Sequence, residues 1–367
     1  MDPRIERLRG EIVAQEPGAR GIEHVARNPE CLRLRAVTIA GLPPSEAAKI
    51  LDAPNDEGQS PFALAMGNRF EHQLLQNGAA ELFALYRKEG LLALHESKIV
   101  AVSEFAPESK PRDLLRREAE TKRLLLLKLR GSADAPNLII KPRLRVILVG
   151  MPHPIEPDYF VASDSEGFYR VGELKSYADR GGKTDQADIR SACRQAAVGT
   201  VALRQLLQTL LPFASSDLVE SRADLVLKVT GLMIPSLYSM KIEGEVDSIE
   251  RALAESPTSL DELEALLPTG ATLSDPATLS AIPNNYRSSC KEHCAMWRYC
   301  RAQAISNEQP AVLGDYAAEK LAPAGNISRA IQLMTGTGEP PRDAAEASLA
   351  RDLQAANQVL QKAAAND

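Results

Sequence analysis

Aromatic residues and long apolar runs are scarce in this sequence of 367 residues. It contains a single Trp, and aromatic residues make up 4% of the chain, which argues against a carbohydrate- or peptide-binding cleft lined with rings. No run of eighteen apolar residues occurs, and the first ten residues, MDPRIERLRG, are rich in charge. We therefore expect neither a membrane span nor a signal peptide, and a cytoplasmic location.

An overall excess of positive charge is also lacking. The chain has 43 Lys and Arg residues against 49 Asp and Glu, which gives a formal net charge of −6. A nucleic-acid partner would therefore have to bind at a local basic patch rather than to the protein as a whole.

Cysteine is scarce as well, with five residues in the chain. In a chain of this size without a secretory signal, five cysteines do not indicate a disulfide framework. In the reducing cytoplasm, clustered cysteines more often indicate a metal site or catalysis.

Hydrophobic periodicity predicts an α/β fold. Apolar residues recur every three or four positions from Phe62 to Lys88, for example Met66, Phe70 and Leu74, as one face of a helix requires. A second helical pattern runs through 184–210. Between them, PDYFVAS and FYRVGELKSY flank the turn-rich DSEG and predict a β-hairpin. We expect three layers, with these two helices flanking a mixed central sheet. Further strands are predicted at LRVILVG, 223–233 and 237–243, and an amphipathic helix at 246–266.

The chain divides into four predicted parts. Residues 1–61 form an N-terminal helical segment, 62–280 the α/β core, and 281–305 a segment that contains three cysteines. Residues 306–367 are rich in Ala and predict a helical C-terminal extension, with two helices outside the core.

The hairpin contains the most informative residues of the sequence. Asp158 stands at the start of its first strand, and Glu173 and Lys175 are two positions apart on its second. Alternation along a strand puts Glu173 and Lys175 on one face. Two carboxylates and an ammonium on one sheet face are costly when buried, unless a cation and an anionic ligand neutralise them. Mg²⁺ or Mn²⁺ between Asp158 and Glu173 would do so, with the carbonyl of Leu174 as a further ligand. Lys175 would then orient or deprotonate the attacking water and stabilise charge on a phosphate.

An isolated Glu-x-Lys is common and can be no more than an ion pair on an exposed strand. The combination of Pro-Asp, a hairpin and Gly-Glu-x-Lys is far more specific, and it resembles the PD-(D/E)XK nuclease superfamily. The resemblance implies metal-dependent hydrolysis of phosphodiester bonds, with Asp158, Glu173 and Lys175 as the catalytic set.

The RecB-like branch of this superfamily takes a further metal ligand from a preceding helix, four residues after a Gly. Gly67 is followed at that distance by Glu71, with His72 as its neighbour, so the resemblance implies Glu71 first and His72 as the alternative ligand. RecB-like nucleases also have Q-x-x-x-Y on the helix after the catalytic strand. Gln195 matches the Gln, but Gly199 stands where the Tyr is expected.

Three of the cysteines are close in sequence and predict a metal site. They form the pattern C-x3-C-x5-C, at Cys290, Cys294 and Cys300. Zinc, with Cys31 or His293 completing a tetrahedron, and a [4Fe–4S] cluster with four Cys ligands are both chemically sound. Cys193 falls within an apolar helical pattern and indicates a small core residue.

The wider arrangement of the cysteines resembles the iron–sulfur branch of RecB-like nucleases. One N-terminal Cys, a nuclease core and three C-terminal Cys are typical of that branch, which includes the CRISPR-associated adaptation nuclease and the nuclease module of AddB-type helicase–nucleases. The resemblance covers roughly residues 25–305. It implies that Cys31, Cys290, Cys294 and Cys300 bind a structural [4Fe–4S] cluster, with zinc as the alternative.

One segment of the chain is strongly basic. Residues 110–145 contain eleven Lys and Arg against four acidic residues, which favours contacts with a DNA backbone. The alternative is a solvated helix face. The predicted DNA contacts are Arg112, Arg116, Arg117, Lys122 and Arg123, together with Arg190 and Arg194 on helix 184–210.

The sequence therefore predicts a metal-dependent deoxyribonuclease, an exonuclease or endonuclease that acts on single strands or ends. We expect it to act in DNA repair or anti-phage defence, with a helicase, an integrase or another defence protein as its partner. One alternative is a nuclease-like subunit that binds DNA ends in a larger complex with weak or no cleavage. Another is a zinc-stabilised scaffold in which the hairpin carboxylates are incidental.

Overall fold

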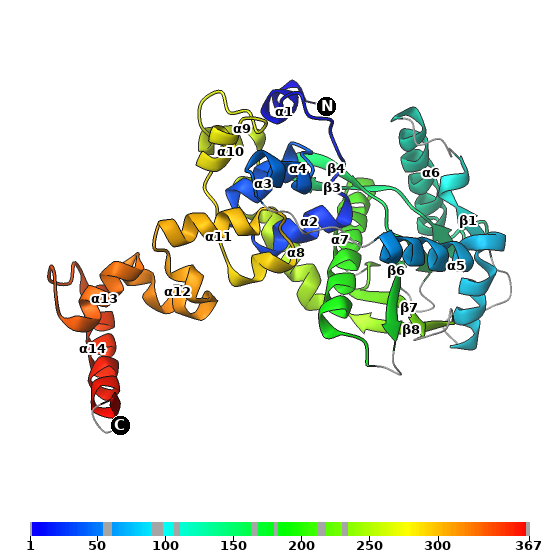
Figure 1. The fold of residues 1–367 in the computed structure, drawn as a ribbon. Helices are drawn as coiled ribbons and strands as arrows, with labels where there is room; N and C mark the ends of the chain where they lie inside the picture. The colour runs from blue at the N-terminus through cyan, green and yellow to red at the C-terminus, as the bar shows by residue number, and fades with distance from the viewer. Residues whose placement is uncertain are drawn as a thin grey trace.

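A mixed six-stranded sheet with helices on both faces lies toward one side of the molecule, away from the C-terminal end (Figure 1). The computed structural model describes residues 2–53, 61–89, 98–105, 111–162, 168–179, 183–211, 218–229 and 234–364. Within these ranges no helix has the length and apolar character that crossing a membrane requires.

The N-terminal segment is helical, as predicted. Cys31 lies in the connection between the second and third of its helices, directly before the first residue of the third. These helices are α1 (Pro3–Arg9), α2 (Gly18–Arg27), α3 (Leu32–Ile39) and α4 (Pro44–Ile50).

The sheet has the strand order β1-β2-β5-β6-β7-β8. β1 with β2 and β6 with β7 are parallel, and the other neighbouring pairs are antiparallel, so the predicted mixed sheet is confirmed. LRVILVG also forms a strand, but it pairs in a separate two-stranded sheet with the strand that follows it. The central strands are β1 (Ile99–Ala101), β2 (Leu138–Ile140), β5 (Tyr159–Ala162), β6 (Tyr169–Asp179), β7 (Arg222–Val229) and β8 (Pro235–Lys241), and the separate pair is β3 (Leu144–Leu148) with β4 (Met151–Ile155).

Two long helices cover opposite faces of this sheet. Along β5, Tyr159 and Val161 belong to the buried cluster that includes the apolar residues of α5 (Pro61–Lys88). The alternate residue Phe160 belongs to the cluster that includes α7 (Gln186–Leu210). Because successive side chains of a strand point to opposite faces, the sheet lies between α5 and α7, as predicted. The basic segment forms a third long helix, α6 (Pro111–Leu129).

α5 is not the single continuous helix that its periodicity predicts. Its backbone leaves the helical conformation at residues 76–79, where Asn77, Gly78 and Ala79 have φ values of 54°, 68° and 58°. Left-handed residues end a right-handed helical segment, so two helical stretches meet there. Phe62, predicted on the packed face, is 76% exposed, whereas Phe70 is buried.

The pattern at 246–266 is also divided. The structure has two helices, α8 (Glu243–Ala254) and α9 (Leu260–Leu266), where one was expected. Pro257 lies between them and has no backbone N–H with which to continue a helix. Ser259 then caps the second helix, because its side chain accepts a hydrogen bond from the backbone N–H of Glu262.

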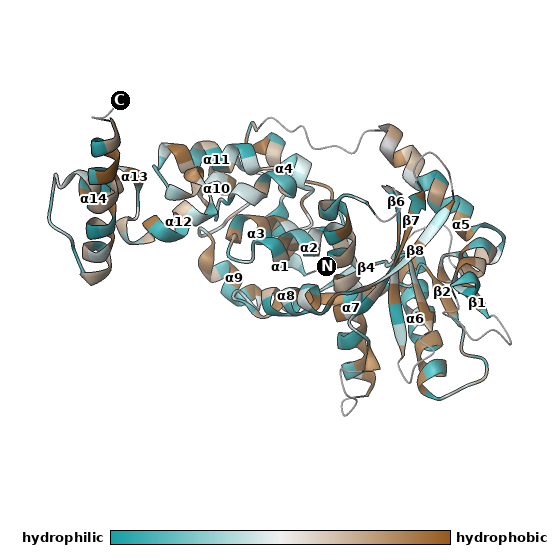
Figure 2. Cartoon of the chain, turned by 90° about the horizontal axis from the view of Figure 1, so that it is seen from below, coloured by the Kyte–Doolittle hydropathy of each residue, from teal (hydrophilic) through white to brown (hydrophobic). Residues whose placement is uncertain are grey.

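The C-terminal residues form an arm that extends away from the sheet (Figures 1 and 2). It follows α10 (Pro276–Ala281), the 3-10 helix η3 (Ser288–Glu292) and α11 (Trp297–Ser306). Two helices were predicted beyond residue 310, but the described part of the arm has three α-helices, because Gly325 and the segment after Thr335 divide it. They are α12 (Asp315–Leu321), α13 (Ile327–Thr335) and α14 (Ala344–Ala364).

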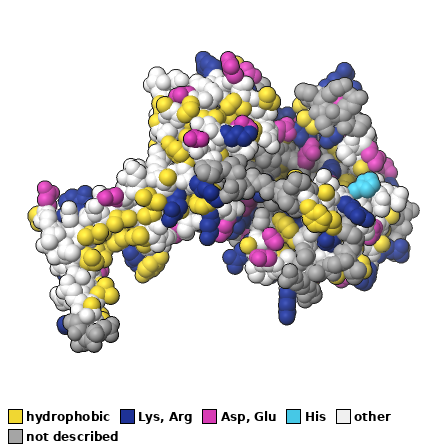
Figure 3. Space-filling model, in the orientation of Figure 1, with side chains coloured by type: hydrophobic (Ala, Val, Ile, Leu, Met, Phe, Trp, Pro, Cys, Tyr) yellow, Lys and Arg dark blue, Asp and Glu magenta, His cyan; other side chains and the backbone are white. Residues whose placement is uncertain are grey.

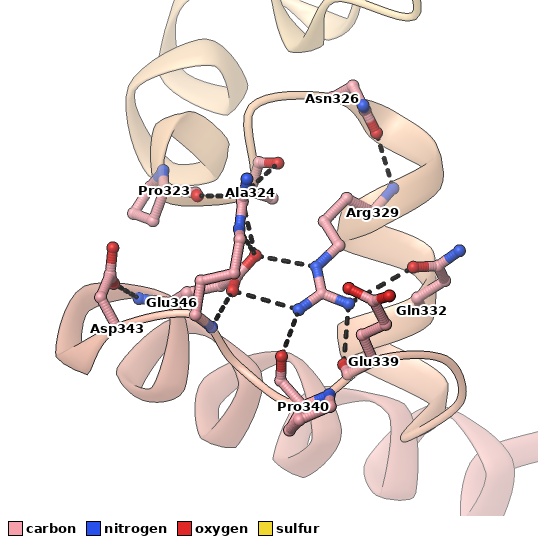
Figure 4. A network of polar contacts seen from close by, with 10 residues as sticks. Pro323, Ala324, Asn326, Arg329, Gln332, Glu339, Pro340, Asp343 and Glu346 are labelled. Atoms are coloured by element: carbon pink, nitrogen blue, oxygen red, sulfur yellow. Dashed lines mark hydrogen bonds and ion pairs between the residues drawn. The ribbon is translucent and has the colours of Figure 1, made fainter.

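A buried carboxylate joins the last two helices of the arm (Figure 4). Glu346 at the start of α14 is fully buried. Its oxygens accept hydrogen bonds from Arg329 of α13, at 2.8 and 3.1 Å, and from Arg342, at 2.9 and 3.1 Å. Hydrogen bonds from Arg329 and Arg342 hold the pKa of Glu346 far below its usual range. A small apolar cluster that includes Leu333 and Leu349 completes this helical hairpin.

Gly172 of β6 is required where β5 and β6 pack together. A Cβ atom at this position would lie 1.9 Å from Cζ of Tyr159 on the neighbouring strand. The Tyr159 hydroxyl is 2.9 Å from the hydroxyl of buried Tyr86 and 3.3 Å from the carbonyl oxygen of Asp224, so the ring has little freedom to move aside. A side chain at position 172 would therefore separate β5 from β6.

We expect Gly172→Ala to lower the free energy of unfolding by about 3 kcal/mol, the cost of overpacking a well-filled core. Chemical denaturation measures this change. Gly244→Ala in α8 is the matched control, because a Cβ atom there has no neighbour within 4 Å. Equal stabilities of the two variants would contradict the assigned role of Gly172.

Candidate active site and cysteine cluster

The hairpin of β5 and β6 brings Asp158, Glu173 and Lys175 together. Tyr159 is paired with Gly172, so one further step in register sets Asp158 beside Glu173. Asp158 Oδ2 accepts a hydrogen bond from the backbone N–H of Leu174 at 2.8 Å, and Lys175 Nζ lies 2.8 Å from Glu173 Oε2. The DSEG turn that was predicted to join the strands falls within 163–167, outside the described residues.

Helix α7 adds Gln195 to this group. Lys175 Nζ donates a hydrogen bond to Gln195 Oε1 at 2.9 Å, so the structure brings Gln195 beside the lysine. Gly199, one turn later, packs tightly on the sheet. A Cβ atom at Gly199 would already lie 3.1 Å from Val171 and 3.2 Å from Pro157. The Tyr of the RecB-like pattern therefore has no room at this position.

A second lysine, Lys141, lies in the site and was not identified from the sequence. Its Nζ is 2.6 Å from Asp158 Oδ1 and 2.7 Å from Glu71 Oε1 of α5. From the sequence, Lys141 is only one of the eleven basic residues of segment 110–145, and it belongs to no recognisable motif. Glu71 thus reaches the hairpin through Lys141, while its neighbour His72 is exposed. Glu71, His72 and Lys141 line an open cavity of about 460 Å³.

The site concentrates charge away from water. Burial raises the pKa of Glu173 to about 7, with Asp158 adding to the shift and Lys175 opposing it. Burial alone would raise the pKa of Asp158 too, but Lys141 and Lys175 lower it overall. At Glu173 burial thus outweighs the ion pair with Lys175, whereas at Asp158 the two lysines outweigh burial and the pKa falls.

The oxygen atoms of the hairpin suit a hard divalent cation. The carboxylates of Asp158 and Glu173 and the carbonyl of Leu174 are ligand types that Mg²⁺ and Mn²⁺ accept. In the described part of the chain, however, no three His, Cys, Asp or Glu side chains are positioned as a ready-made metal site. Glu71, the predicted helix ligand, is engaged with Lys141 instead. The donor chemistry fits the metal, and binding it at Glu71 would require the ion pair between Glu71 and Lys141 to separate.

The basic segment does not form one continuous exposed face. On α6, Arg112 and Lys122 are exposed, and the side chain of Arg116 is 57% exposed. Arg117 is buried, with Nη1 at 3.6 Å from Glu156, so it lies apart from the exposed residues. Arg123 donates two hydrogen bonds to the neighbouring Glu120.

The two arginines predicted on α7 lie in different surroundings. Arg190 is exposed. The side chain of Arg194 is 32% exposed, and its Nη1 lies 3.7 Å from Oε1 of the buried Glu23 on α2. Arg190 thus remains accessible to a ligand, whereas Arg194 contributes to the packing of α2 on α7.

Four cysteines from opposite ends of the core line one small buried cavity. They have no disulfide partner and are at most 7% exposed. Burial raises the pKa of the Cys294 thiol well above its usual value and that of Cys300 to about 11, and the neighbouring thiols add to both shifts. The cavity is lined by Cys31, Cys290, Cys294 and Cys300, with other residues around them.

Hydrogen-bond donors surround these sulfur atoms. Arg33 is fully buried, and its Nη1 lies 3.2 Å from the Cys300 sulfur. It also donates to oxygen atoms of Ser280, Ile282 and Gln303 and lies over the ring of Tyr299. A guanidinium that donates to sulfur is a partner that an anionic cysteine-ligated group accepts, so the donor set fits such a group.

The remaining candidate ligands lie apart from this cavity. His293 does not line it, and its ring centroid lies 5.7 Å from that of His24 on α2. Cys193 is buried within α7, as expected for a core residue. The sequence left Cys31 and His293 as candidates for the fourth ligand, and the structure places Cys31 in the cavity with the other three cysteines.

No protein-family model, curated protein or solved structure matches this chain. Any assignment of function therefore depends on the residues of the hairpin and of the cysteine cavity, and on their geometry.

Proposed function

We propose that this protein is a Mg²⁺- or Mn²⁺-dependent deoxyribonuclease of the PD-(D/E)XK type, in the RecB-like iron–sulfur branch. One observation carries the proposal. Asp158, Glu173 and Lys175 lie on one hairpin, and the lysine also contacts Gln195. Burying two carboxylates and an ammonium on a sheet face is costly for stability alone. Such a costly arrangement of buried charges is typical of a catalytic site.

The roles of the residues follow from their charge. Asp158, Glu173 and the carbonyl of Leu174 would hold the divalent ion, which when bound polarises a phosphate and activates water. Burial would lower the pKa of Lys175, but Glu173 and Asp158 raise it overall, so the side chain carries a proton at neutral pH. In the metal-free site it is therefore a hydrogen-bond donor, and in the proposed reaction it would orient or deprotonate the attacking water and stabilise charge on the phosphate. Gln195 fixes the direction of its ammonium group.

The cysteine cavity supports a structural [4Fe–4S] cluster within this proposal. Four buried thiols face one small space, and donors from Arg33 and Asn28 reach their sulfur atoms. Hydrogen bonds to the sulfurs are a feature of iron–sulfur sites. Cysteines around a cluster each bind a different iron atom, so they need not approach one point as zinc ligands do. Metal analysis of anaerobically purified protein distinguishes iron from zinc.

We propose that the exposed arginines of α6, Arg112 and Arg116, bind the DNA backbone. We expect Arg112→Glu with Arg116→Glu to weaken binding equally for all DNA sequences, because backbone phosphates carry no sequence information. The slope of log K against log salt should flatten by roughly 0.7–0.9 for each lost phosphate contact. Fluorescence anisotropy over a salt series measures both. A double variant with the wild-type slope would show that this face is only solvated.

A cleavage assay separates the enzyme from the alternative, a DNA-end-binding subunit with weak or no activity. Single-stranded, duplex and forked DNA are incubated with the protein and Mn²⁺, with a chelator as the control. Cutting that Mn²⁺ restores after chelation supports the enzyme. Binding of all three DNAs without any cutting would favour the subunit.

One feature favours a protein partner in either case. Apolar side chains are exposed on the C-terminal arm, where Figure 3 shows them gathered beside the body of the molecule. Leu313, Tyr316 and Ile331 are 60%, 75% and 50% exposed. Exposed apolar groups in proximity are typical of protein–protein contacts. A helicase, an integrase or another protein of DNA repair or anti-phage defence is the class of partner that the nuclease proposal implies.

A further inference from the structure

Lys141 holds two acidic side chains that come from different elements. Its ammonium lies 2.7 Å from Glu71 Oε1 on α5 and 2.6 Å from Asp158 Oδ1 at the start of β5. The lysine side chain is 22% exposed. A cation between two carboxylates from separate elements is also the arrangement of a divalent metal ion in an acidic site.

The backbone fixes the lysine in this place. Lys141 directly follows β2, and its N–H donates a hydrogen bond to the carbonyl oxygen of Asp158 at 2.9 Å. Its φ is 49°, in the left-handed region that residues with a Cβ atom rarely adopt. A strained conformation of this kind persists only where the surrounding structure imposes it. The β2–β5 pairing thus anchors the Lys141 backbone beside Asp158, within reach of both carboxylates.

The balance of charge shows what the ammonium does there. Glu71, Asp158 and Glu173 can contribute three negative charges, against which Lys141 and Lys175 supply two positive ones. Both oxygen atoms of Asp158 are occupied, Oδ1 by Lys141 and Oδ2 by the N–H of Leu174. An incoming divalent ion therefore meets a carboxylate that is already paired and a site of much reduced negative potential.

We propose that the Lys141 ammonium is a built-in competitor of the divalent ion: it occupies the cation position between Glu71 and Asp158, and the metal binds these carboxylates only by displacing it. The inference rests on the proposed metal site and deepens it, because it assigns to a residue outside the D…E-x-K set the control of metal affinity. Lys141 is a positioning residue in this role. The released ammonium, anchored by its backbone next to Asp158, stays within reach of an anion that the metal brings in.

Metal titration tests the competition directly, without DNA. Metal-free protein with its cysteine site intact is titrated with Mn²⁺ by isothermal calorimetry. Lys141→Met should bind Mn²⁺ at least about tenfold more tightly than wild type, because both the competitor and a repelling charge are removed. Lys141→Asn should do the same, and Asn tolerates the left-handed backbone at this position. Lys141→Arg keeps a cation and should retain the wild-type affinity.

Lys98→Met is the matched control. Lys98 Nζ also pairs with an acid, lying 2.9 Å from Asp134, but this pair is on the surface and away from the hairpin. Its loss should leave Mn²⁺ affinity unchanged. Unchanged or weaker Mn²⁺ binding by both Lys141→Met and Lys141→Asn, or no Mn²⁺ binding by any form, would overturn the inference. Tighter binding by a protein that cuts no DNA would uphold it while the nuclease proposal fails.

Discussion

Asp158→Asn, Glu173→Gln and Lys175→Ala should each reduce Mn²⁺-dependent DNA cleavage by about a thousandfold or more. The first two substitutions remove the negative charge of an oxygen ligand while they preserve the shape of the side chain. The third removes the ammonium that lies 2.8 Å from Glu173 and is oriented by Gln195. Because the three groups act on one reaction centre, any single loss disables it. The initial rate of cleavage of a labelled oligonucleotide is the measurement.

Asp134→Asn is the matched control for these variants. Asp134 also pairs with a lysine, but its side chain is 83% exposed and lies on the surface, so its loss should leave the rate unchanged. DNA affinity, measured with Ca²⁺ or without metal, should persist in all four variants. Undiminished cutting by any one of the three site variants would refute the assignment of its residue.

Cys31→Ala should remove the iron and lower the melting temperature by about 5 °C or more. Cys31 and the C-terminal trio are separated by roughly 260–270 residues, so a shared cluster closes almost the whole core into one loop. Closing so long a loop restricts the unfolded chain, and metal binding to a site absent from that chain contributes to folding. A loss of about 3 kcal/mol corresponds to a shift of this size, because an entropy of unfolding of about 2.1 cal/mol/K per residue gives about 2 °C per kcal/mol for a core of roughly 270 residues.

Cys193→Ala separates ligation from packing. Cys193 is equally buried, but it lies within α7 and outside the cysteine cavity. It should retain its full iron content, with only the small loss of stability that follows from a smaller side chain. Iron retained by Cys31→Ala and lost by Cys193→Ala would exclude Cys31 as the fourth ligand. Iron per chain and thermal unfolding, measured on the same preparations, decide between these outcomes.

The sequence predicted those features of the site and fold that depend on geometry between residues close in the chain. Strand alternation and a short hairpin suffice to place Glu173 and Lys175 on one face with Asp158 beside them. The two long helices followed from apolar periodicity for the same reason, whereas the mixed sheet was expected as part of the PD-(D/E)XK fold that the sequence resembles. Helix interruptions were missed, because the left-handed turn at Asn77 and the break at Pro257 leave the apolar spacing around them intact.

What the sequence could not predict depends on contacts between distant segments. Lys141 enters the site because β2 pairs with β5 and because its backbone is left-handed, neither of which a motif records. The basic segment predicted Arg117 among the DNA contacts, yet its side chain is buried beside Glu156. Ligand chemistry left Cys31 or His293 to complete the trio and the resemblance implied Cys31, and the packing of the segment before α3 against the C-terminal residues places Cys31 in the cavity with the trio.

The buried Glu346 of the C-terminal arm, with its partners Arg329 and Arg342, has a consequence for local unfolding of the protein. Glu346, its two arginine partners and a few apolar residues such as Leu333 and Leu349 form a centre that is separate from the core around the sheet. A unit with its own small centre can open without unfolding the rest of the protein. We therefore expect amide hydrogens of α13 and α14 to exchange with solvent through this local opening, on a shorter timescale than those of β6. Their exchange rates would then report on the stability of the arm itself rather than on that of the α/β core.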